Sequence, residues 1–402
     1  MMKRRSYLLA LAVVVTGWLV SGVTAQGAGR IAPVNKARTE RWSPEKIQKW
    51  YAQQEWLVGA NFLPSTAINQ VEMWDAETFD TKTIQRELAL AHGLGFNIVR
   101  VYLHDTCFEK DGEGLMKRMD QLLDLCKANE IKPLFVFFDD CWLCPSQVPN
   151  LVPAPRPGTH NSGWLQSPGQ ALVRTYPSNP VLQKNLKKYV QTVLCRFAQD
   201  ERILGWDLYN EPGNRASVRF DEQGEEIPGE KRAEPTLEGT AALLNDAYDW
   251  AWEVNPSQPL TSGIWEKSKA LKEIRSIQLT RSDLLSFHCY NGGGDIKEYY
   301  IPTLEKNAPG RPAICTEYMA RSGSTFINDL PVFKEHNIGA INWGLVSGKS
   351  QTIYGWGTWK KPGPTPEPEK WFHDILRPDG SAYDPAEVKF IREITDRKKT
   401  SK

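Results

Sequence analysis

The sequence predicts a single α/β domain in which eight parallel strands and the helices between them close into a (β/α)₈ barrel. Two observations predict this fold. Eight short apolar runs alternate along the chain with longer segments of helical periodicity. The runs are apolar almost throughout, which is typical of parallel strands covered on both faces, and eight right-handed strand–helix units close into a barrel. A doubly wound open sheet is the alternative, but no Gly-x-Gly-x-x-Gly motif follows the first run.

The composition permits such a domain and argues against a nucleic-acid partner. The chain has 402 residues, and barrels of this class reach about 250 residues or more as one domain. A net charge of +1 gives no basic surface field that would attract nucleic acid. Tryptophan is unusually frequent, with 15 residues. Its flat apolar face serves a core, and it also serves a site that stacks against ligand rings.

The N-terminus has the pattern of a signal peptide over residues 1–25. Lys3 to Arg5 form a basic start, Tyr7 to Val20 form an apolar run, and Ala25 ends a small-residue cleavage site. The alternative is a membrane anchor, but the run is shorter than the ~20 residues that a spanning helix needs. We therefore expect an exported protein, periplasmic or secreted, with a flexible leader over residues 26–42 and no membrane span after signal removal.

The barrel domain is predicted over residues 43–397. Ser43 caps a first helix that Pro44 and Glu45 open and that runs to about Gln53. The expected strands are residues 56–62, 97–103, 132–138, 203–208, 259–264, 284–290, 312–316 and 339–343. The further helices are expected at residues 80–94, 115–129, 180–200, 236–255, 267–274, 326–336, 371–376 and 385–395.

Two long loops interrupt this alternation. Residues 139–179 follow the third strand and residues 212–235 follow the fourth. Loops of this length inside a compact domain are usually functional. The Pro-rich residues 362–368 are interpreted as a loop before the last helix, because too little chain follows them to make a domain.

The seven cysteines do not predict a metal site. Cys141 and Cys144 have the spacing of a metal or redox motif, but no second Cys pair and no His pair accompanies them. In an exported chain they could instead form a short-loop disulfide, and the sequence leaves this open. We expect no metal and no cofactor.

Polar and aromatic side chains follow the predicted strands at their C-terminal ends, where barrel enzymes carry their sites. The candidates, in chain order, are Asn61, Arg100, His104, Asp139, Asn210, Glu211, Trp265, His288, Tyr290, Glu317 and Trp343. Glu211 lies at a corner between a buried strand and Pro212, which has no N–H and disfavours a helix before it. On its own this glutamate could be an ordinary loop carboxylate.

Two of these residues suggest a reaction. Glu211 and Glu317 end strands that are three apart in a ring of eight, so their carboxyl groups can face each other over a ligand. Glycosidic bond cleavage requires one carboxyl group that donates a proton and one ionised carboxylate. We expect Arg100 to keep Glu317 ionised and Tyr290 to orient it. Repulsion between the two carboxylates would raise the pKa of Glu211, which makes it the acid.

Three motifs lie at the ends of the fourth, sixth and seventh strands. They are Asn210-Glu211-Pro212, His288-Cys289-Tyr290 and Thr316-Glu317-Tyr318. In this order they resemble the retaining glycoside hydrolases of clan A, and the cellulase-like glycoside hydrolase family 5 or a near relative in particular. The resemblance covers residues 45–395.

The resemblance implies Glu211 as general acid/base and Glu317 as nucleophile. It implies Asn210 as the partner of the sugar 2-hydroxyl group and Trp343 as a sugar platform. Arg100, His288 and Tyr290 would support the carboxylates. The chain departs from the family at the third strand, where typical members carry histidines and this chain has Asp139-Asp140. It also departs at residues 344–356, a segment that could close one end of the cleft. Both departures concern the substrate and leave the chemistry unchanged.

Two other functions compete with a retaining β-glycoside hydrolase. One is a carbohydrate-binding barrel without catalysis, although all expected catalytic residues are present. The other is a metal-dependent hydrolase, which the scattered histidines disfavour. The expected partner is an oligo- or polysaccharide. The sugar, the linkage, the choice between endo and exo action, and the oligomeric state stay open, although the long loops favour a short cleft.

Overall fold

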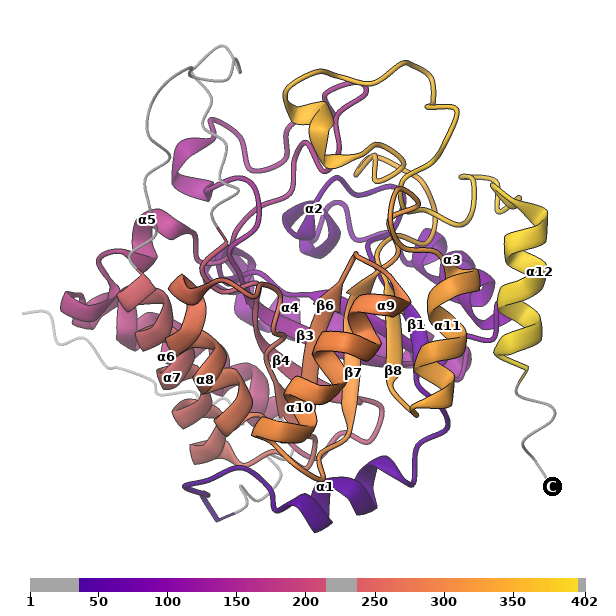
Figure 1. The fold of residues 1–402 in the computed structure, drawn as a ribbon. Coiled ribbons are helices and arrows are strands. Elements are labelled where there is room, and N and C mark those ends of the chain that lie inside the picture. Colours follow the sequence, from indigo (N-terminus) through magenta and orange to yellow (C-terminus); the bar gives the residue numbers. More distant parts are fainter. Residues whose placement is uncertain (1–35, 215–236, 397–402) are drawn as a thin grey trace, which may run out of the picture. The chain divides into compact units, whose positions relative to one another are not determined.

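A computed structural model describes residues 36–214 and 237–396, and it confirms the barrel (Figure 1). The eight strands pair in parallel with their neighbours in sequence, in the order β5-β4-β3-β2-β1-β8-β7-β6. Their bounds are β1 Val58–Asn61, β2 Ile98–Tyr102, β3 Lys132–Asp139, β4 Gly205–Asn210, β5 Leu260–Thr261, β6 Leu285–Cys289, β7 Ala313–Tyr318 and β8 Gly339–Asn342.

The ring closes between β5 and β6 through separate backbone hydrogen bonds. β5 is only two residues long, and no continuous ladder joins it to β6. Beyond its end, the backbone N–H of Ile264 donates to Ser286 (2.9 Å), and the N–H of His288 donates to Ile264 (2.8 Å). These hydrogen bonds complete the barrel at the mouth and hold His288 in register there.

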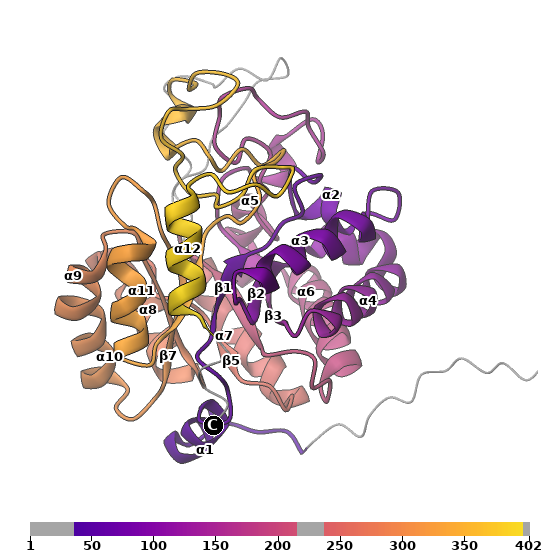
Figure 2. The ribbon, with the colours of Figure 1, turned by 90° about the vertical axis from the view of Figure 1, so that its right-hand side faces the viewer.

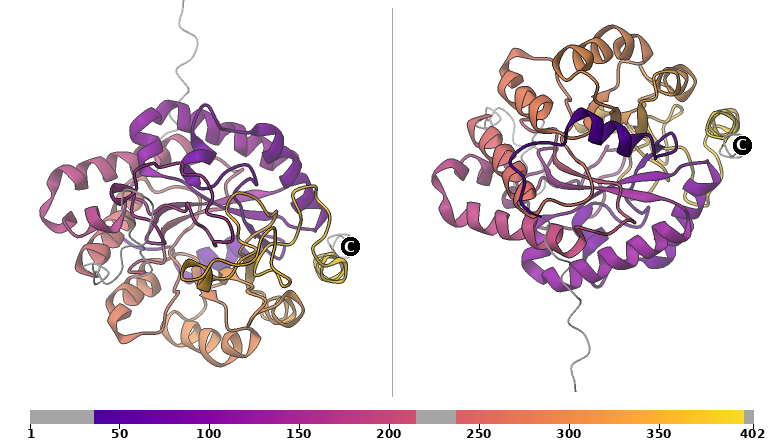
Figure 3. Two further views of the ribbon diagram at one scale, coloured as in Figure 1. Left: turned by 90° about the horizontal axis from the view of Figure 1, so that it is seen from above. Right: turned by 90° about the horizontal axis from the view of Figure 1, so that it is seen from below.

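Helices surround the strands, as the views from the side, from above and from below show (Figures 2 and 3). Their bounds are α1 Pro44–Tyr51, α2 Gln70–Trp74, α3 Thr81–Gly93, α4 Asp105–Ala128, α5 Gln170–Val173, α6 Pro180–Phe197, α7 Leu237–Val254, α8 Lys272–Arg281, α9 Gly293–Asp295, α10 Ile301–Asn307, α11 Phe326–Glu335 and α12 Pro385–Ile394. Single turns lie at η1 Pro145–Gln147, η2 Tyr176–Ser178, η3 Lys269–Leu271, η4 Ile296–Tyr300 and η5 Trp356–Trp359.

In the described part of the chain, the buried apolar side chains form four clusters. The largest lies between the strands and the helices, and the second fills the lower end of the barrel. There Ile98, Ile314 and Ile341 pack against Ile47 and Tyr51 of α1, which closes the barrel from below (Figure 1). The apolar filling of this lower end leaves the opposite end, where the strands terminate, for polar groups.

The helix expected at residues 371–376 is wrong. That segment is extended and makes isolated bridges between Leu376 and both Val346 and Ala382. All of its residues except Phe372 are buried, so its apolar character alone does not distinguish a helix from an irregular buried segment. The expected helix at residues 267–274 is also misplaced, because α8 begins at Lys272 and continues to Arg281. The helices between β6 and β7 were missed, because glycines 292–294 open that segment.

The segment before α1 is anchored to the lower end of the barrel from Lys36 onward. The Arg38 guanidinium donates to both carboxylate oxygens of Asp283 (2.7 and 2.8 Å), and the backbone N–H of Trp42 donates to the same group (2.6 Å). Residues 36–42, which were expected to be part of a flexible leader, are therefore tied down. The expected signal peptide and residues 26–35 lie outside the described residues. No helix in the described ranges is long and apolar enough to cross a membrane.

We expect Asp283→Ala to lower the free energy of unfolding by about 3 kcal/mol or more, because it leaves Arg38 without its buried carboxylate. Asp283 is fully buried and also accepts the backbone N–H of Leu260 (2.9 Å). The measurement is urea unfolding followed by circular dichroism. The matched control is Glu253→Ala, which removes an exposed ion pair to Lys187 (2.8 Å) and should cost no more than about 1 kcal/mol. Equal losses in the two variants would contradict this account.

Candidate active site

The corner after β4 carries Glu211 in a strained backbone conformation. Its φ angle is +43°, which residues with a side chain seldom adopt. Buried Asp140 holds this corner, because it accepts the backbone N–H of Gly213 (2.7 Å) and the hydroxyl of Tyr209 (2.8 Å). Strain of this kind persists where the surroundings over-determine the backbone, and it concentrates at functional sites.

The end of β7 carries Glu317 at a break in strand pairing. The register with β6 shifts between Phe287 and His288, and the register with β8 shifts between Cys315 and Tyr318. An irregularity of this kind re-aims a side chain at the rim of a barrel. As a result His288 pairs with Glu317, and both side chains lie in the barrel mouth.

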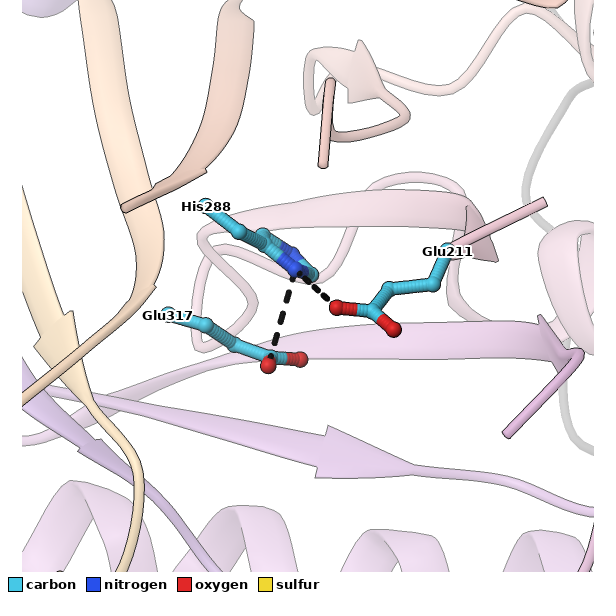
Figure 4. A group of neighbouring side chains, drawn as sticks. All are labelled: Glu211, His288 and Glu317. Atoms are coloured by element: carbon cyan, nitrogen blue, oxygen red, sulfur yellow. Dashed lines mark hydrogen bonds and ion pairs between the residues drawn. The ribbon is translucent and has the colours of Figure 1, made fainter. Parts of the chain in front are cut away.

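The two glutamates face each other across His288 (Figure 4). The Nδ1 atom of His288 lies 2.8 Å from Oε1 of Glu211 and 3.5 Å from Oε2 of Glu317. One carboxylate oxygen of each glutamate and one ring nitrogen of His288 lie within 4.8 Å of one another. Retaining glycosidases hold their carboxyl groups about 5–5.5 Å apart, whereas inverting enzymes need about 6.5–9.5 Å to admit a water molecule. The close spacing therefore suits direct attack by a carboxylate.

Glu317 is built to carry a negative charge. Arg100 Nη1 donates to its Oε1 (3.0 Å), as does the Tyr102 hydroxyl (3.1 Å), and the Tyr290 hydroxyl donates to Oε2 (2.8 Å). Burial and the nearby charge of Glu211 raise the pKa of Glu317, while Arg100 and the Tyr290 hydrogen bond oppose that rise. Three donors, one of them the buried guanidinium of Arg100, thus stabilise the ionised form of Glu317.

Glu211 has only uncharged donors in direct contact. The Cys141 thiol donates to its Oε2 (3.1 Å), and so does the side-chain amide of Asn214. Burial raises the pKa of Glu211, and these two hydrogen bonds limit the rise. Burial also lowers the pKa of His288 to about 4, so this ring is neutral near pH 7. Since Arg100 contacts only the other glutamate, a proton shared by the pair resides on Glu211.

The three side chains also have the spacing of a metal site. The atoms that could bind a metal already form hydrogen bonds, however, and Arg100 Nη1 lies 3.0 Å from Oε1 of Glu317. A cation placed between the glutamates would be repelled by this buried guanidinium. The arrangement therefore suits proton transfer and nucleophilic attack better than metal binding.

A cavity of about 420 Å³ opens above the glutamates. Seven of the predicted site residues line it: Asn210, Glu211, Trp265, His288, Tyr290, Glu317 and Trp343. Three more predicted residues, Asn61, Arg100 and Asp139, are joined to these by hydrogen bonds. Arg100 donates to the Oδ1 atoms of Asn61 (3.0 Å) and Asn210 (2.6 Å), and Asp139 accepts the Nδ2–H of Asn210 (2.9 Å). The structure thus brings ten predicted residues together.

His104 is the predicted residue that the structure does not bring to the cavity. Its ring is fully buried, Nε2 lies 3.0 Å from the Gln166 carbonyl oxygen, and Nδ1 accepts the backbone N–H of Thr106 at the start of α4. In this position His104 caps a helix and supports the loop after β3.

Sequence reasoning missed several residues that line the cavity. His160 and Asn161 come from the loop after β3, and His373 comes from the loop after β8. These side chains lie far from any strand end, so the strand-end rule could not find them. Cys141 was noticed only for its spacing to Cys144. Both are free thiols in this structure, and Cys141 contacts Glu211 directly.

No model of a known protein family matches this sequence, and no curated protein matches it. Solved structures do share the fold. The GH5_18 protein from Streptomyces cattleya, solved in complex with Manβ1-4GlcNAc, is 14% identical with a TM-score of 0.57, covering 86% of this chain and 81% of that one. Exo-β-1,4-mannosidase Op5Man5 from Opitutaceae bacterium strain TAV5 is 16% identical with a TM-score of 0.53 over 85% of this chain. This chain spans only 59% of that protein's length.

An endo-1,4-β-mannanase from Rhizomucor miehei is 13% identical with a TM-score of 0.51, covering 84% of this chain and 97% of that one. At these identities the likeness establishes the fold. It confirms the resemblance to the barrels of glycoside hydrolase family 5.

We expect Cys141→Ala to raise the pKa of Glu211, because the thiol hydrogen bond favours the ionised carboxylate. Cys141→Ser keeps a donor and should leave this pKa close to that of the wild type. Both can be followed by ¹³C NMR titration of carboxyl-labelled glutamate, with Glu211→Gln to assign the resonance. An unchanged or lowered pKa in the alanine variant would contradict the role given to Cys141.

Proposed function

We propose that the protein is an exported retaining β-glycoside hydrolase that cleaves β-linked oligo- or polysaccharides by double displacement. The observation that carries this proposal is the spacing of Glu211 and Glu317, whose nearest oxygens lie within 4.8 Å across the barrel mouth. Their unequal surroundings support a division of roles, since Arg100 contacts Glu317 and does not contact Glu211.

In the first step a carboxylate oxygen of Glu317 attacks the anomeric carbon. Glu211 gives its proton to the glycosidic oxygen, and the bond from that oxygen to the anomeric carbon breaks. The products are a free alcohol and a covalent glycosyl ester on Glu317. Formation of this ester removes the negative charge of Glu317, so that charge no longer opposes ionisation of Glu211.

In the second step Glu211 acts as the base. Its carboxylate takes a proton from water, the water oxygen attacks the anomeric carbon, and the ester bond to Glu317 breaks. Two inversions give net retention. Arg100 and Tyr290 then hold the released carboxylate in place for the next turnover.

The sugar next to the glutamates would lie over Trp343. This ring is buried and meets Trp164 and Tyr102 edge to face. Asn210 would contact the sugar 2-hydroxyl group through Nδ2, because its Oδ1 is taken by Arg100, and Nδ2 makes only a long hydrogen bond to the Cys141 sulfur (3.5 Å) beyond its bond to Asp139. Since the structural neighbours are named as mannosidases and mannanases, β-mannosides are the first substrates to test.

We expect Glu317→Ala to abolish turnover of an aryl β-glycoside. Added azide should attack in place of the carboxylate and yield a glycosyl azide of inverted configuration. Glu211→Ala should slow hydrolysis by about 10²–10⁴-fold, since it removes general acid/base catalysis. The assays are release of the aryl group and NMR of the azide products. Full activity in Glu317→Ala would overturn the assignment, and binding without cleavage by the wild type would favour a carbohydrate-binding barrel.

Export is the second part of the proposal, and the signal pattern of residues 1–25 supports it. Expression of the full chain in a bacterial host should yield a mature protein that begins at Gln26. The intact mass and the N-terminal sequence of the product recovered outside the cytoplasm check this. Retention of Met1 in membrane-bound protein would instead identify an anchor.

A further inference from the structure

Two histidines outside the predicted site line one end of the cavity. His160 belongs to the loop after β3 and His373 to the loop after β8, and their ring centroids lie 5.4 Å apart. They are 1% and 0% exposed, although each has a polar ring. Buried polar groups are normally hydrogen-bonded, so their partners indicate what each ring does.

Each ring uses one nitrogen to anchor itself. Nδ1 of His160 lies 2.8 Å from the carbonyl oxygen of Tyr354, and Nδ1 of His373 lies 2.6 Å from that of Met319. A carbonyl oxygen only accepts, so Nδ1 carries the hydrogen in both rings and Nε2 is left as an acceptor. Within the described ranges, Nε2 of His373 is buried and has no hydrogen-bond partner.

Both rings stay neutral. Burial lowers the pKa of His160 to about 4, and burial also lowers the pKa of His373 well below its usual range. Among residues 36–214 and 237–396, no carboxylate forms a hydrogen bond or ion pair with either ring. The rings of Trp142 and Phe372 pack against His160, and those of Trp356 and Phe372 pack against His373. Two neutral acceptors in an aromatic wall match the donors of an uncharged ligand, as a sugar hydroxyl is.

The wall is rigid because the two loops are hydrogen-bonded to each other. The backbone N–H of His160 donates to the Thr358 hydroxyl (3.0 Å), and that of Asn161 donates to the Ser350 carbonyl oxygen (2.9 Å). A further bond joins Gly363 to Gly158 (2.8 Å). Both loops lie above the strand ends of the barrel (Figures 1 and 3).

The cavity is more deeply buried at one end than at the other. Toward the loop wall most of the lining is buried, with Trp164 at 3% and Trp343 at 8% exposure, while Trp356, which packs against His373, is 42% exposed. Near Glu211 the lining is open, because Asn214 and Trp265 are partly exposed. The leaving group must lie on the side of Glu211, which gives it a proton. The sugar that is bonded to Glu317 must therefore occupy the buried end.

We propose that His160 and His373 form a subsite that recognises the hydroxyl groups of a non-reducing terminal sugar, so that the enzyme removes single sugars from chain ends. This inference rests on the proposed glycosidase function and deepens it. Each Nε2 accepts a hydrogen bond from a sugar hydroxyl group, and the wall leaves no passage for a chain beyond that sugar. Hydroxyl groups other than that on C2 are the partners, since Asn210 serves C2.

The first test pairs variants with deoxy sugars. His373→Asn and His160→Asn keep a donor for the backbone carbonyl oxygen but lose the Nε2 acceptor. Each should lower kcat/KM for the preferred aryl β-glycoside by about tenfold, mainly through KM. On one of the 3-, 4- or 6-deoxy analogues the same variant should show no further loss, because the bond is already absent. Equal additional losses on every analogue would overturn the subsite.

The matched control is His104→Asn. His104 is equally buried on the same side of the barrel but lies outside the cavity, so its variant should keep the wild-type pattern across the deoxy analogues. Circular dichroism and thermal unfolding show which variants fold. If His373→Asn fails to fold, His160→Asn makes the same test, because it lies on the other loop.

The second test sizes products from tetrasaccharides that carry a label at the reducing end, with β-1,4-linked mannose and glucose as probes. The first labelled product should be the trisaccharide, and internal cleavage would overturn the inference while leaving the glycosidase proposal intact. If no glycoside is cleaved, the proposed function fails. Binding of free monosaccharides, followed by tryptophan fluorescence, then tests the subsite alone, and equal affinities of wild type and His373→Asn would overturn it.

Discussion

The buried guanidinium of Arg100 is the interaction on which the barrel mouth depends. A charge with no exposed surface is costly unless every donor is paired, and here Asp207, Glu317 and Asn210 share its donors with Asn61. These partners come from three different strands, β1, β4 and β7. Since removal of one partner would leave a buried charge unpaired, the position of Glu317 is tied to the integrity of the barrel itself.

This constraint explains why the two glutamates differ although they lie close together. Glu317 is buried and Glu211 is largely covered, and burial raises both pKa values. The guanidinium contacts Glu317 alone, whereas Glu211 receives hydrogen bonds from a thiol and an amide. The backbone reinforces the difference, because Glu317 sits at a break in strand pairing and Glu211 at a strained corner. Two residues of the same type can therefore take different roles, one as the proton donor and the other as the ionised carboxylate.

The loops after β3 and β8 convert an open barrel mouth into a cavity with a buried end. Their hydrogen bonds to each other fix His160 and His373 in place, and aromatic rings exclude water around them. Because the two histidine rings are already held in place, little conformational entropy is lost when a sugar binds. The same barrel can thus serve chain ends or chain interiors, depending on what its loops build above the strands.

The sequence by itself determined the barrel and most of its site. Strand and helix periodicities are local, and the residue at each strand end reaches the mouth by topology alone, which is why Glu211, Glu317 and Arg100 could be predicted. Tertiary structure decided the rest. His104 caps a helix, Cys141 contacts Glu211, and the histidine pair faces the cavity because of hydrogen bonds between loops almost 200 residues apart in sequence. Loop positions carry no periodicity, so only the folded chain could reveal them.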